Sequence, residues 1–428
     1  MEHKVFLTDE ENDMLLGKAG TMKQKAMEVI VRYADVLGAK KLCKITKAHL
    51  FCGAHPFMLS FPSSDPDEVI SKMLFCSDEK VALDRYECPY CQSDAAPMDS
   101  EKWRSMGVAE PEAKRNEQFL HRFLDSGVHL ASSCIPYMLG FVPLMGEHYV
   151  STESHAVVLM NSLWGACGNA DGVEIAFSAA ACGRIPLWGT HIAENRKGTH
   201  IFRVLCNVAS THDWDLLGYT VGRKLPTHSV PVLVGAPRPN IVDLKSFFAS
   251  LATTAGPEIC HIVGITPEAP TLDSAMGGNK PVRDVTVTEE DLEESRRMLS
   301  DAGEGSVQYV SVGCPHYSID QVERAARYLR GKKIAEGVTL QVWTAPQIRY
   351  LADRCGYSKV IEDAGGVVLT GSCPMVSEKL PKNAAGLAFD SAKQAHYLRP
   401  VDLMQGKKIY YGSMEQCLEA ALSGMWKE

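Results

Sequence analysis

The amino-acid sequence predicts an α/β fold with several mostly parallel sheets flanked by helices. The main observation is a repeated order of short apolar, β-type runs and helical stripes through the second half of the chain. Such alternation produces parallel strands joined by helices that cover the sheet. The length agrees, because 428 residues exceed what one hydrophobic core usually serves. The apolar fraction of 45% and the charged fraction of 22% are those of an ordinary globular protein.

The N-terminal part begins with two predicted helices. Thr8 is a suitable N-cap, and Glu11 three residues later closes a capping box. Apolar residues recur at helical spacing through 21–37, which predicts a long amphipathic helix. Prolines cluster near 225–240, and we place a soft boundary there. It divides residues 1–428 into an N-terminal lobe, 1–230, and a C-terminal lobe, 240–428.

The second half contains the clearest strand–helix pairs. Ser318 and Gln321 form a capping box behind one apolar run, and Pro346 suits the first turn of a helix behind another. Thr288 is expected to cap a helix that ends near residue 302. The stretch 267–286 is rich in Pro, Gly and Asp and is expected to be a long loop. We expect strands at 259–266, 307–312, 338–343, 366–370 and 408–411, and a helix at about 413–422.

Composition also narrows the class of protein. The net charge of −8 argues against nucleic acid or an anionic membrane as a main partner. No apolar run approaches the ~18 residues that a membrane-spanning helix needs. The start, Met1-Glu2-His3-Lys4, lacks the apolar region of a signal peptide. Fourteen cysteines without an export signal indicate reduced thiols, so we expect a cytoplasmic protein.

Three cysteines share a local pattern in which proline lies close by. Cys134 lies in Ser-Cys-Ile-Pro, Cys314 in Gly-Cys-Pro-His and Cys373 in Ser-Cys-Pro. The last two follow predicted strands directly, and strand carboxyl ends line the ligand crevice of open α/β sheets. Thiolates in such loops can hold an iron–sulfur cluster. A [4Fe–4S] cluster with three thiolates leaves one iron open as a Lewis acid for a substrate hydroxyl. The alternative is three unrelated buried cysteines at loop starts.

A second cysteine pattern, Cys88-Pro89-Tyr90-Cys91, is half of a zinc site or a redox pair. Cys76 or Cys52 could complete a zinc knuckle, although the spacing matches no common framework. Zinc at Cys88 and Cys91 therefore stays open beside two other interpretations, a loop with two free thiols and a disulfide.

Four further residues are candidates for the site. His49 ends an apolar run and could act as a general base or orient a hydroxyl group; the alternative is a histidine satisfied by a backbone carbonyl. His316 follows Cys314 by two residues and could orient that metal ligand or bind substrate; the alternative is a histidine on the loop surface. Ser391 and Lys393 could hold an anion, although Lys393 could equally be a solvated helix residue.

Short segments from about Leu7 to Leu422 carry a family resemblance over nearly the whole chain. In their order and spacing they resemble the aconitase X family of hydro-lyases. The segments are Ala48-His49, Gly146-Glu147-His148, Glu153-Ser154-His155-Ala156-Val157, Asn161-Ser162-Leu163-Trp164-Gly165-Ala166, Thr266-Pro267-Glu268-Ala269, Gly313-Cys314-Pro315-His316 and Ser391-Ala392-Lys393.

The resemblance implies an aconitase-like fold with its sheets around a central cluster cleft. It implies an iron–sulfur hydro-lyase large subunit that eliminates water from a small hydroxy acid, since known family activities include dehydration of cis-3-hydroxy-L-proline and of phosphorylated mevalonate. The cluster, [4Fe–4S] in its main expected form, would be held by Cys134, Cys314 and Cys373. A separate small swivelling-domain subunit is the implied partner. Glu153, Ser154, Asn161 and Asn169 lie in the best-matching segment and are expected to bind substrate, with helix capping and turn formation as their alternative role.

One departure bears on the substrate. The family commonly has Gly-Ala-Arg-Thr-Asn-Arg-Glu-Gly where this chain has Gly-Ala-Cys-Gly-Asn-Ala-Asp-Gly at 165–172. Both arginines, the usual bidentate partners of carboxylate or phosphate, are replaced, by Cys167 and Ala170. We therefore expect a less anionic substrate, or one bound through Arg184, Arg196 or Lys197.

Three rival functions remain. The first is a non-catalytic metal-binding scaffold of the same fold, which the missing arginines favour. The second is a lyase with a single iron or zinc ion held by the same cysteines. The third is a thiol-nucleophile enzyme that uses Cys314 and His316, although adjacent residues rarely orient as nucleophile and base.

Overall fold

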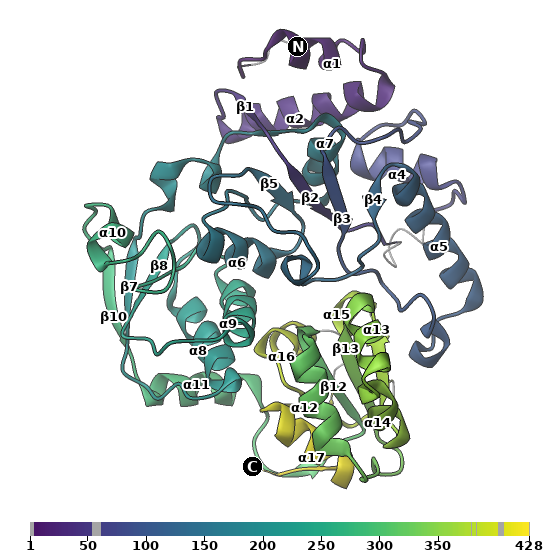
Figure 1. Ribbon diagram of the computed structural model, residues 1–428, viewed down its shortest axis with the longest axis vertical. Helices are drawn as coiled ribbons and strands as arrows, with labels where there is room; N and C mark the ends of the chain where they lie inside the picture. The colour runs from purple at the N-terminus through teal and green to yellow at the C-terminus, as the bar shows by residue number, and fades with distance from the viewer. Residues whose placement is uncertain (1–3, 54–60, 378, 382, 401–405, 428) are drawn as a thin grey trace.

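The computed structural model describes residues 4–53, 61–377, 379–381, 383–400 and 406–427. It contains three α/β units in chain order, each built on one parallel sheet (Figure 1). The prediction of several mostly parallel sheets flanked by helices is confirmed. No helix within the described ranges is long and apolar enough to cross a membrane.

The first unit has a four-stranded sheet in the order β4-β3-β2-β5. Its strands are β2 (Lys47–Leu50), β3 (Tyr90–Ser93), β4 (Val128–His129) and β5 (Tyr149–Ser151). A short antiparallel pair, β1 (Leu42–Lys44) with β6 (Arg184–Pro186), lies beside it. The helices of this unit are α1 (Asp9–Leu15), α2 (Thr21–Leu37), α4 (Pro66–Leu74), α5 (Glu110–Asp125), α6 (Ser154–Trp164) and α7 (Val173–Cys182), with short 3-10 turns η1 (Trp103–Met106), η2 (Pro136–Met138), η3 (Gly189–His191) and η4 (Ala193–Arg196).

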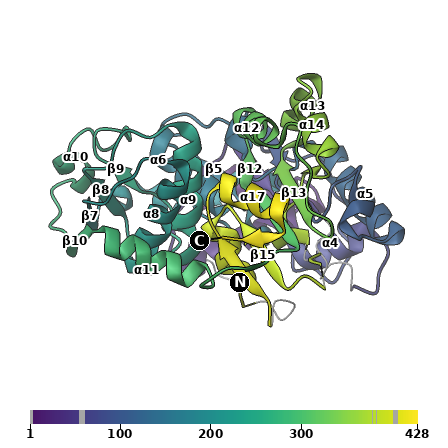
Figure 2. The ribbon, with the colours of Figure 1, turned by 90° about the horizontal axis from the view of Figure 1, so that it is seen from below.

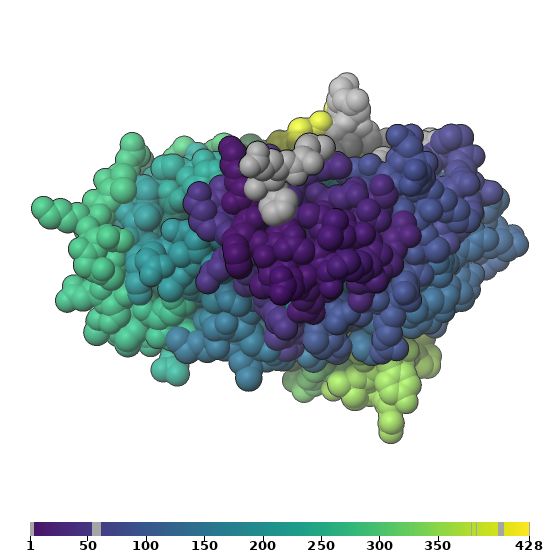
Figure 3. Space-filling model, turned by 90° about the horizontal axis from the view of Figure 1, so that it is seen from above, coloured from purple at the N-terminus to yellow at the C-terminus, as the bar shows by residue number. Residues whose placement is uncertain are grey.

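The N-terminal helices form as the sequence predicts. Thr8 caps α1 and Glu11 completes the capping box. The second helix, α2, has the predicted bounds and ends where Gly38 adopts a left-handed conformation at φ +71°. Its apolar face packs on α7, which in turn covers β2. Figure 3 shows this N-terminal segment, in purple, spread over the face seen from above.

The second unit has the sheet order β10-β7-β8-β9. The interval 225–240 lies between two helices and contains a strand of this sheet. The elements of the unit are β7 (His200–Val204), α8 (Thr211–Lys224), β8 (Pro231–Val234), α9 (Ile241–Thr254), β9 (His261–Ile262), α10 (Leu272–Met276), β10 (Arg283–Val287) and α11 (Glu289–Leu299). The expected soft boundary therefore falls within one sheet.

The expectation of a long loop at 267–286 is wrong, because this stretch contains α10 and most of β10. The strand β10 pairs with β7 at the sheet edge, and most of its side chains are exposed. An exposed edge strand carries polar residues, so it lacks the apolar run by which a buried strand is recognised. The strand expected at 259–266 is also shorter than predicted, with only two residues in β9.

The third unit has five parallel strands in the order β14-β13-β12-β15-β16. Ser318 and Gln321 cap α12 and Pro346 begins α13, as predicted. The elements are β12 (Tyr309–Tyr317), α12 (Ile319–Leu329), β13 (Thr339–Thr344), α13 (Pro346–Arg354), α14 (Tyr357–Asp363), β14 (Val367–Thr370), α15 (Pro374–Ser377), β15 (Gly386–Phe389), α16 (Ala392–Leu398), β16 (Lys408–Tyr411) and α17 (Met414–Ser423), with a small antiparallel pair β11 (Gly305–Ser306) and β17 (Met425–Trp426).

The units pack against one another through buried side chains. One core cluster joins α6 of the first unit, α8 and α9 of the second, and β15, α16 and β16 of the third. Helix α9 also contacts β12 directly. In the view of Figure 2 the third unit lies between α8 and α9 on one side and α5 on the other. The segments that follow strands of the first and third sheets are thereby brought together at the centre of the molecule.

Candidate active site

The three cysteines singled out by their sequence pattern lie on two loops and in the last part of one strand, between the first and third units. Cys134 follows β4, Cys373 follows β14, and Cys314 lies at the irregular end of β12, where the register with β13 shifts. Gly313 has φ +105°, and a side chain there would lie 2.3 Å from the Trp343 carbonyl oxygen. Only glycine allows this close approach, which positions the next residue, Cys314.

The three thiols interact with one another in a buried environment. Burial raises the pKa of each thiol, that of Cys373 to about 11, and repulsion of Cys314 by Cys134 and by Cys373 adds to the effect. Backbone N–H groups oppose it, since His316 N lies 3.5 Å from Cys134 Sγ. A bound metal reverses this preference, because a coordinating thiol is deprotonated.

The His316 side chain ties the three cysteine loops together. Its Nε2 lies 2.7 Å from the carbonyl oxygen of Ser372, and its Nδ1 lies 2.9 Å from Ser133 Oγ. A carbonyl can only accept, so Nε2–H donates to Ser372 and Nδ1 accepts the Ser133 hydroxyl proton. Burial lowers the pKa of His316 to about 4, which keeps the ring neutral. With both nitrogens engaged, it cannot act as the base for a Cys314 nucleophile.

His49 extends the same series of hydrogen bonds. Its Nε2 donates to the Ser133 carbonyl oxygen at 3.0 Å, and its Nδ1 accepts from Ser151 Oγ at 3.2 Å. The ring is fully buried, and burial lowers its pKa to about 4. The predicted role of general base requires a free nitrogen, so this geometry favours His49 as a positioning residue for the Cys134 loop.

A buried ion pair joins the first and third units beside the thiols. Lys393 Nζ lies 2.8 Å from Glu153 Oε1, and His155 Nδ1 lies 2.7 Å from the same oxygen. Burial alone would raise the pKa of Glu153, but Lys393 and His155 hold it well below its usual range. Lys393 is thus a buried partner of Glu153 and not a solvated helix residue.

Two buried polar atoms beside this pair have no hydrogen-bond partner within the described part of the chain. They are Nε2 of His155 and the hydroxyl of Tyr137, whose rings meet edge to face at 6.1 Å. Burial raises the pKa of Tyr137, and Cys134 acts in the same direction, which places this phenol close to the thiols. Buried polar atoms are normally satisfied, so these two are free to form hydrogen bonds with a bound group.

Sequence reasoning missed two charged residues at the site. Lys245, in the middle of α9, donates from Nζ to the His316 carbonyl oxygen at 2.6 Å and to Gln321 Oε1 at 2.6 Å. Burial lowers its pKa to about 8, while Cys134 acts in the opposite direction. Asp94 follows β3, and burial together with Glu153 raises its pKa well above the usual range. The signal for Lys245 was available, since a lone lysine interrupts the apolar run of α9.

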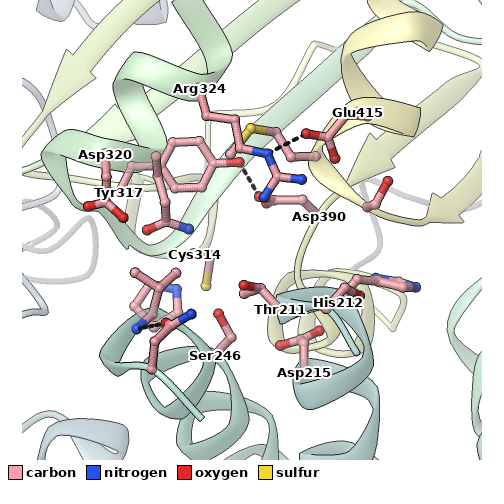
Figure 4. A pocket seen from close by; sticks show the side chains of 17 residues that line it. Thr211, His212, Asp215, Ser246, Cys314, Tyr317, Asp320, Arg324, Asp390 and Glu415 are labelled. Carbon is pink, nitrogen blue, oxygen red and sulfur yellow. Dashed lines mark hydrogen bonds and ion pairs between the residues drawn. The ribbon is translucent and has the colours of Figure 1, made fainter. Parts of the chain in front are cut away.

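Cys314 also lines a cavity of about 200 Å³ between the second and third units (Figure 4). Four acidic side chains line it: Asp215, Asp320, Asp390 and Glu415. Arg324 pairs with Glu415 at 2.6 Å, and Tyr317 donates to Asp390. Burial raises the pKa of Asp390 to about 6 and that of Asp215 to about 7. The raised pKa values and the Arg324 ion pair reduce the negative charge of this acidic cavity, which Cys314 lines.

The other predicted substrate residues divide into two groups. Ser154 is half-buried in the first turn of α6, and the buried Ser391 hydroxyl has no hydrogen-bond partner in the described part of the chain. Asn161 instead accepts from Tyr149 and Gly168 and donates to two carbonyls, at 2.7 and 2.8 Å. Asn169 accepts through Oδ1 from the backbone N–H and the hydroxyl of Thr190, and its Nδ2 donates to the Trp188 carbonyl oxygen at 3.4 Å. With their amides so occupied, these two asparagines hold a loop, and a substrate contact is not favoured.

The loop at 165–171 runs beside β5. Of its two positions where the family commonly has arginine, only one lies near the site. Cys167 pairs with His148 ahead of β5, whereas Ala170 pairs with Ser151 at the carboxyl end, next to His49. Ala170 is exposed. Two cations proposed as replacements are already neutralised: Arg184 pairs with Glu10 and Glu11, and Arg196 pairs with Glu268.

The cysteines at 88 and 91 are both buried and free, so no disulfide joins them. Cys91 Sγ donates to the Cys88 carbonyl oxygen at 3.8 Å. In the described ranges, no third Cys, His, Asp or Glu group completes a ligand set with them. The geometry thus favours a loop with two thiols over the zinc site.

The separation of the sulfurs bears on the kind of metal centre. One ion bound at a metal–sulfur distance of ~2.3 Å would hold its thiolates within about 4.6 Å of one another. Cys134, Cys314 and Cys373 do not form a group within 4.8 Å, since the one such group found among the described residues lies elsewhere. The spread suits a cluster of several metal ions better than a single ion.

Sequence profiles of the aconitase X first, second and third domains match residues 4–194, 198–297 and 307–423. The chain belongs to the aconitase X family. It is 32% identical to the phosphomevalonate dehydratase large subunit of Methanothermobacter thermautotrophicus, over 92% of this chain and 94% of that one. It is 31% identical to the cis-3-hydroxy-L-proline dehydratase of Hypocrea jecorina, over 98% of this chain and 69% of that one.

The structure is also similar to the crystal structure of holo aconitase X from Thermococcus kodakaraensis, with a TM-score of 0.81 and 27% identity over 97% of this chain and all of that one. Both named relatives are dehydratases, so this is a family of hydro-lyases. The sequence-based recognition of the aconitase X family is confirmed.

Proposed function

We propose that the protein is the large subunit of an iron–sulfur hydro-lyase that removes water from a small hydroxy acid. Its family supports the reaction class, because the named relatives are dehydratases. The observation that supports the cofactor is that three half-buried thiols lie close together, beside polar atoms of Tyr137 and His155 that have no hydrogen-bond partner in the described part of the chain. Cys134, Cys314 and Cys373 would hold the cluster, which supplies a Lewis acid for the departing hydroxyl.

The chain's own residues would orient the substrate and move a proton. His155 donates through Nδ1–H to Glu153, which leaves its Nε2 as a lone-pair acceptor. Burial lowers the pKa of His155, so the ring is neutral at neutral pH. We infer that His155, rather than His49, accepts the substrate proton. Lys393 fixes Glu153, which in turn fixes the imidazole.

A separate small subunit is the proposed partner. The phosphomevalonate dehydratase relative, which this chain matches over nearly its full length, is named as a large subunit. The cis-3-hydroxy-L-proline dehydratase relative is longer, since this chain covers 69% of it. The partner would carry the small swivelling domain and complete the cleft around the substrate.

The substrate is proposed to carry less negative charge than a phosphorylated hydroxy acid. Of the two lysines near the thiols, Lys393 pairs with Glu153, whereas Lys245 donates to a carbonyl and an amide, and four acidic side chains line the cavity at Cys314. An anionic phosphate needs fixed cations, above all arginine. A hydroxyproline-like acid fits this electrostatic balance better than a mevalonate phosphate does.

The cluster is tested by anaerobic co-purification with the small subunit, followed by iron and sulfide analysis and EPR. We expect several irons with matching sulfide, and water elimination from a hydroxy acid. Cys314→Ser should lose both, whereas Cys260→Ser, at a more deeply buried thiol of the second unit, should keep both. Iron and sulfide absent from the wild type, or unchanged in Cys314→Ser, would count against the proposal.

The proton acceptor is tested with His155→Gln. General base catalysis contributes ~10²–10⁴ in rate, so kcat should fall by about that factor while iron and sulfide stay bound. In the wild type, activity should rise with pH as His155 loses its proton, below the usual histidine pKa of 6.5. His49→Gln should instead weaken cluster retention. A wild-type acid limb that persists in His155→Gln would refute the assignment.

The substrate proposal is tested with Ala170→Arg, which adds a cation at the carboxyl end of β5. One charge-assisted hydrogen bond of ~1.5–3 kcal/mol corresponds to a gain of about tenfold or more in kcat/KM for the phosphorylated substrate. The double variant with Cys167→Arg should gain little more, because Cys167 lies ahead of β5. A wild-type enzyme already fast on phosphomevalonate would contradict the proposal.

A further inference from the structure

Cys43, His148 and His191 form a second group of metal-ligating side chains, apart from the three cluster cysteines. Cys43 is the central residue of β1, opposite Ile185 of β6. His148 directly precedes β5, and His191 ends η3. One ligand atom from each residue lies within 4.8 Å of the other two, and no other such group of three occurs in the described ranges.

The two imidazoles are spaced as if they shared an ion. Their Nδ1 atoms are 3.0 Å apart. Two nitrogens bound to one tetrahedral zinc at ~2.0–2.1 Å lie about 3.3–3.4 Å apart, so little movement separates the two arrangements. A His–His hydrogen bond explains the distance equally well, which means that a second observation is needed.

That observation is the position of Cys43, which offers a third ligand atom within 4.8 Å of a nitrogen on each ring, while His191 itself is deeply buried. The side chain is 5% exposed, and its Nε2 is buried without a hydrogen-bond partner in the part of the chain that the structure describes. Burial lowers the pKa of His191 to about 3 and also lowers that of His148. Both rings are therefore neutral, which is the state in which imidazole binds a metal.

A second thiol lies at the edge of the group. Cys167 pairs with His148 in a parallel bridge, so its side chain leaves the backbone on the same side. Burial raises the pKa of Cys43 to about 12, and the Cys167 thiol is the next largest influence on it. The two half-buried thiols thus face a common region together with the two imidazoles.

We propose that Cys43, His148 and His191 bind a zinc-class divalent cation, with Cys167 as the fourth ligand after rotation of its side chain. Two thiolates and two imidazoles in tetrahedral geometry are a closed set that selects zinc and leaves no position for substrate. Binding releases the protons of both thiols to solvent.

The site would act as a structural clip. It joins β1, the residue before β5, η3 and the loop at 165–171. The far end of that loop pairs with Ser151, the partner of His49. The ion would therefore fix one end of the loop, while the amides of Asn161 and Asn169 hold its middle.

Zinc content and zinc X-ray absorption of the full-length chain test this proposal, because both are specific for the element and unaffected by iron. We expect one zinc per chain with two sulfur and two nitrogen ligands, at ~2.3 Å and ~2.0–2.1 Å. Cys43→Ser and His148→Gln should each weaken zinc binding at least tenfold and leave iron and sulfide unchanged. Added zinc should raise the unfolding temperature of the zinc-depleted wild type but not of the variants.

Cys88→Ser is the matched control, since it removes a buried thiol of the same unit, and zinc should stay bound. Circular dichroism checks that each variant is folded. Zinc retained at wild-type affinity in folded Cys43→Ser, zinc lost in Cys88→Ser, or a wild type that binds no zinc at micromolar concentration would overturn the site. One sulfur in the absorption spectrum, unchanged in Cys167→Ser, would overturn the assignment of Cys167.

Discussion

The site depends on a buried series of hydrogen bonds that runs from Ser151 through His49, Ser133 and His316 to Ser372. Each imidazole donates from Nε2 to a backbone carbonyl and accepts a serine hydroxyl at Nδ1. The series crosses from the first sheet to the third and passes through the loop of each proposed cysteine ligand. Burial keeps both imidazole rings neutral, so each ring has one donor nitrogen and one acceptor nitrogen. This fixes the direction of every hydrogen bond in the series.

Positive charge near this series of hydrogen bonds opposes the effect of burial on the thiols, because Lys393 acts to lower the pKa of Cys314 and of Cys373. Lys245 and Lys393 are the buried cations on either side of the thiols, and Glu153 neutralises Lys393. Removing one partner of such a pair leaves an uncompensated buried charge, which costs about 3–5 kcal/mol. On the proposed function, this arrangement would suit a substrate with less negative charge than a phosphate, and Nε2 of His155 would be the available lone pair.

The sequence predicted local structure well where a local signal existed. The bounds of α2 and β16 agree with the prediction, as do the capping boxes at Thr8 and Ser318. The edge strand β10 was missed because its residues are polar and exposed. The cysteine patterns indicated which thiols would meet, since two of them end strands of one parallel sheet.

Long-range partners could not be predicted in this way. The residues around Asn161 in the sequence do not predict that its side chain donates to the Gly168 and Glu258 carbonyls. Those around His49 do not predict its hydrogen bond to the Ser133 carbonyl. Cys43 and His191 lie 148 positions apart and meet only because β1 pairs with β6. The sequence predicted a general base at His49, but in the structure this side chain is buried and both ring nitrogens form hydrogen bonds.

The most direct measurement of the central claim is the iron and sulfide content of His316→Ala beside His261→Ala. Both histidines are 1% exposed and both bond a backbone carbonyl through Nε2, at 2.7 Å in each case, but only His316 joins the cysteine loops. We predict that folded, anaerobically prepared His316→Ala loses iron and sulfide although all three cysteines remain, and that His261→Ala retains them. Equal retention in the two variants would contradict the claim that this series of hydrogen bonds assembles the site.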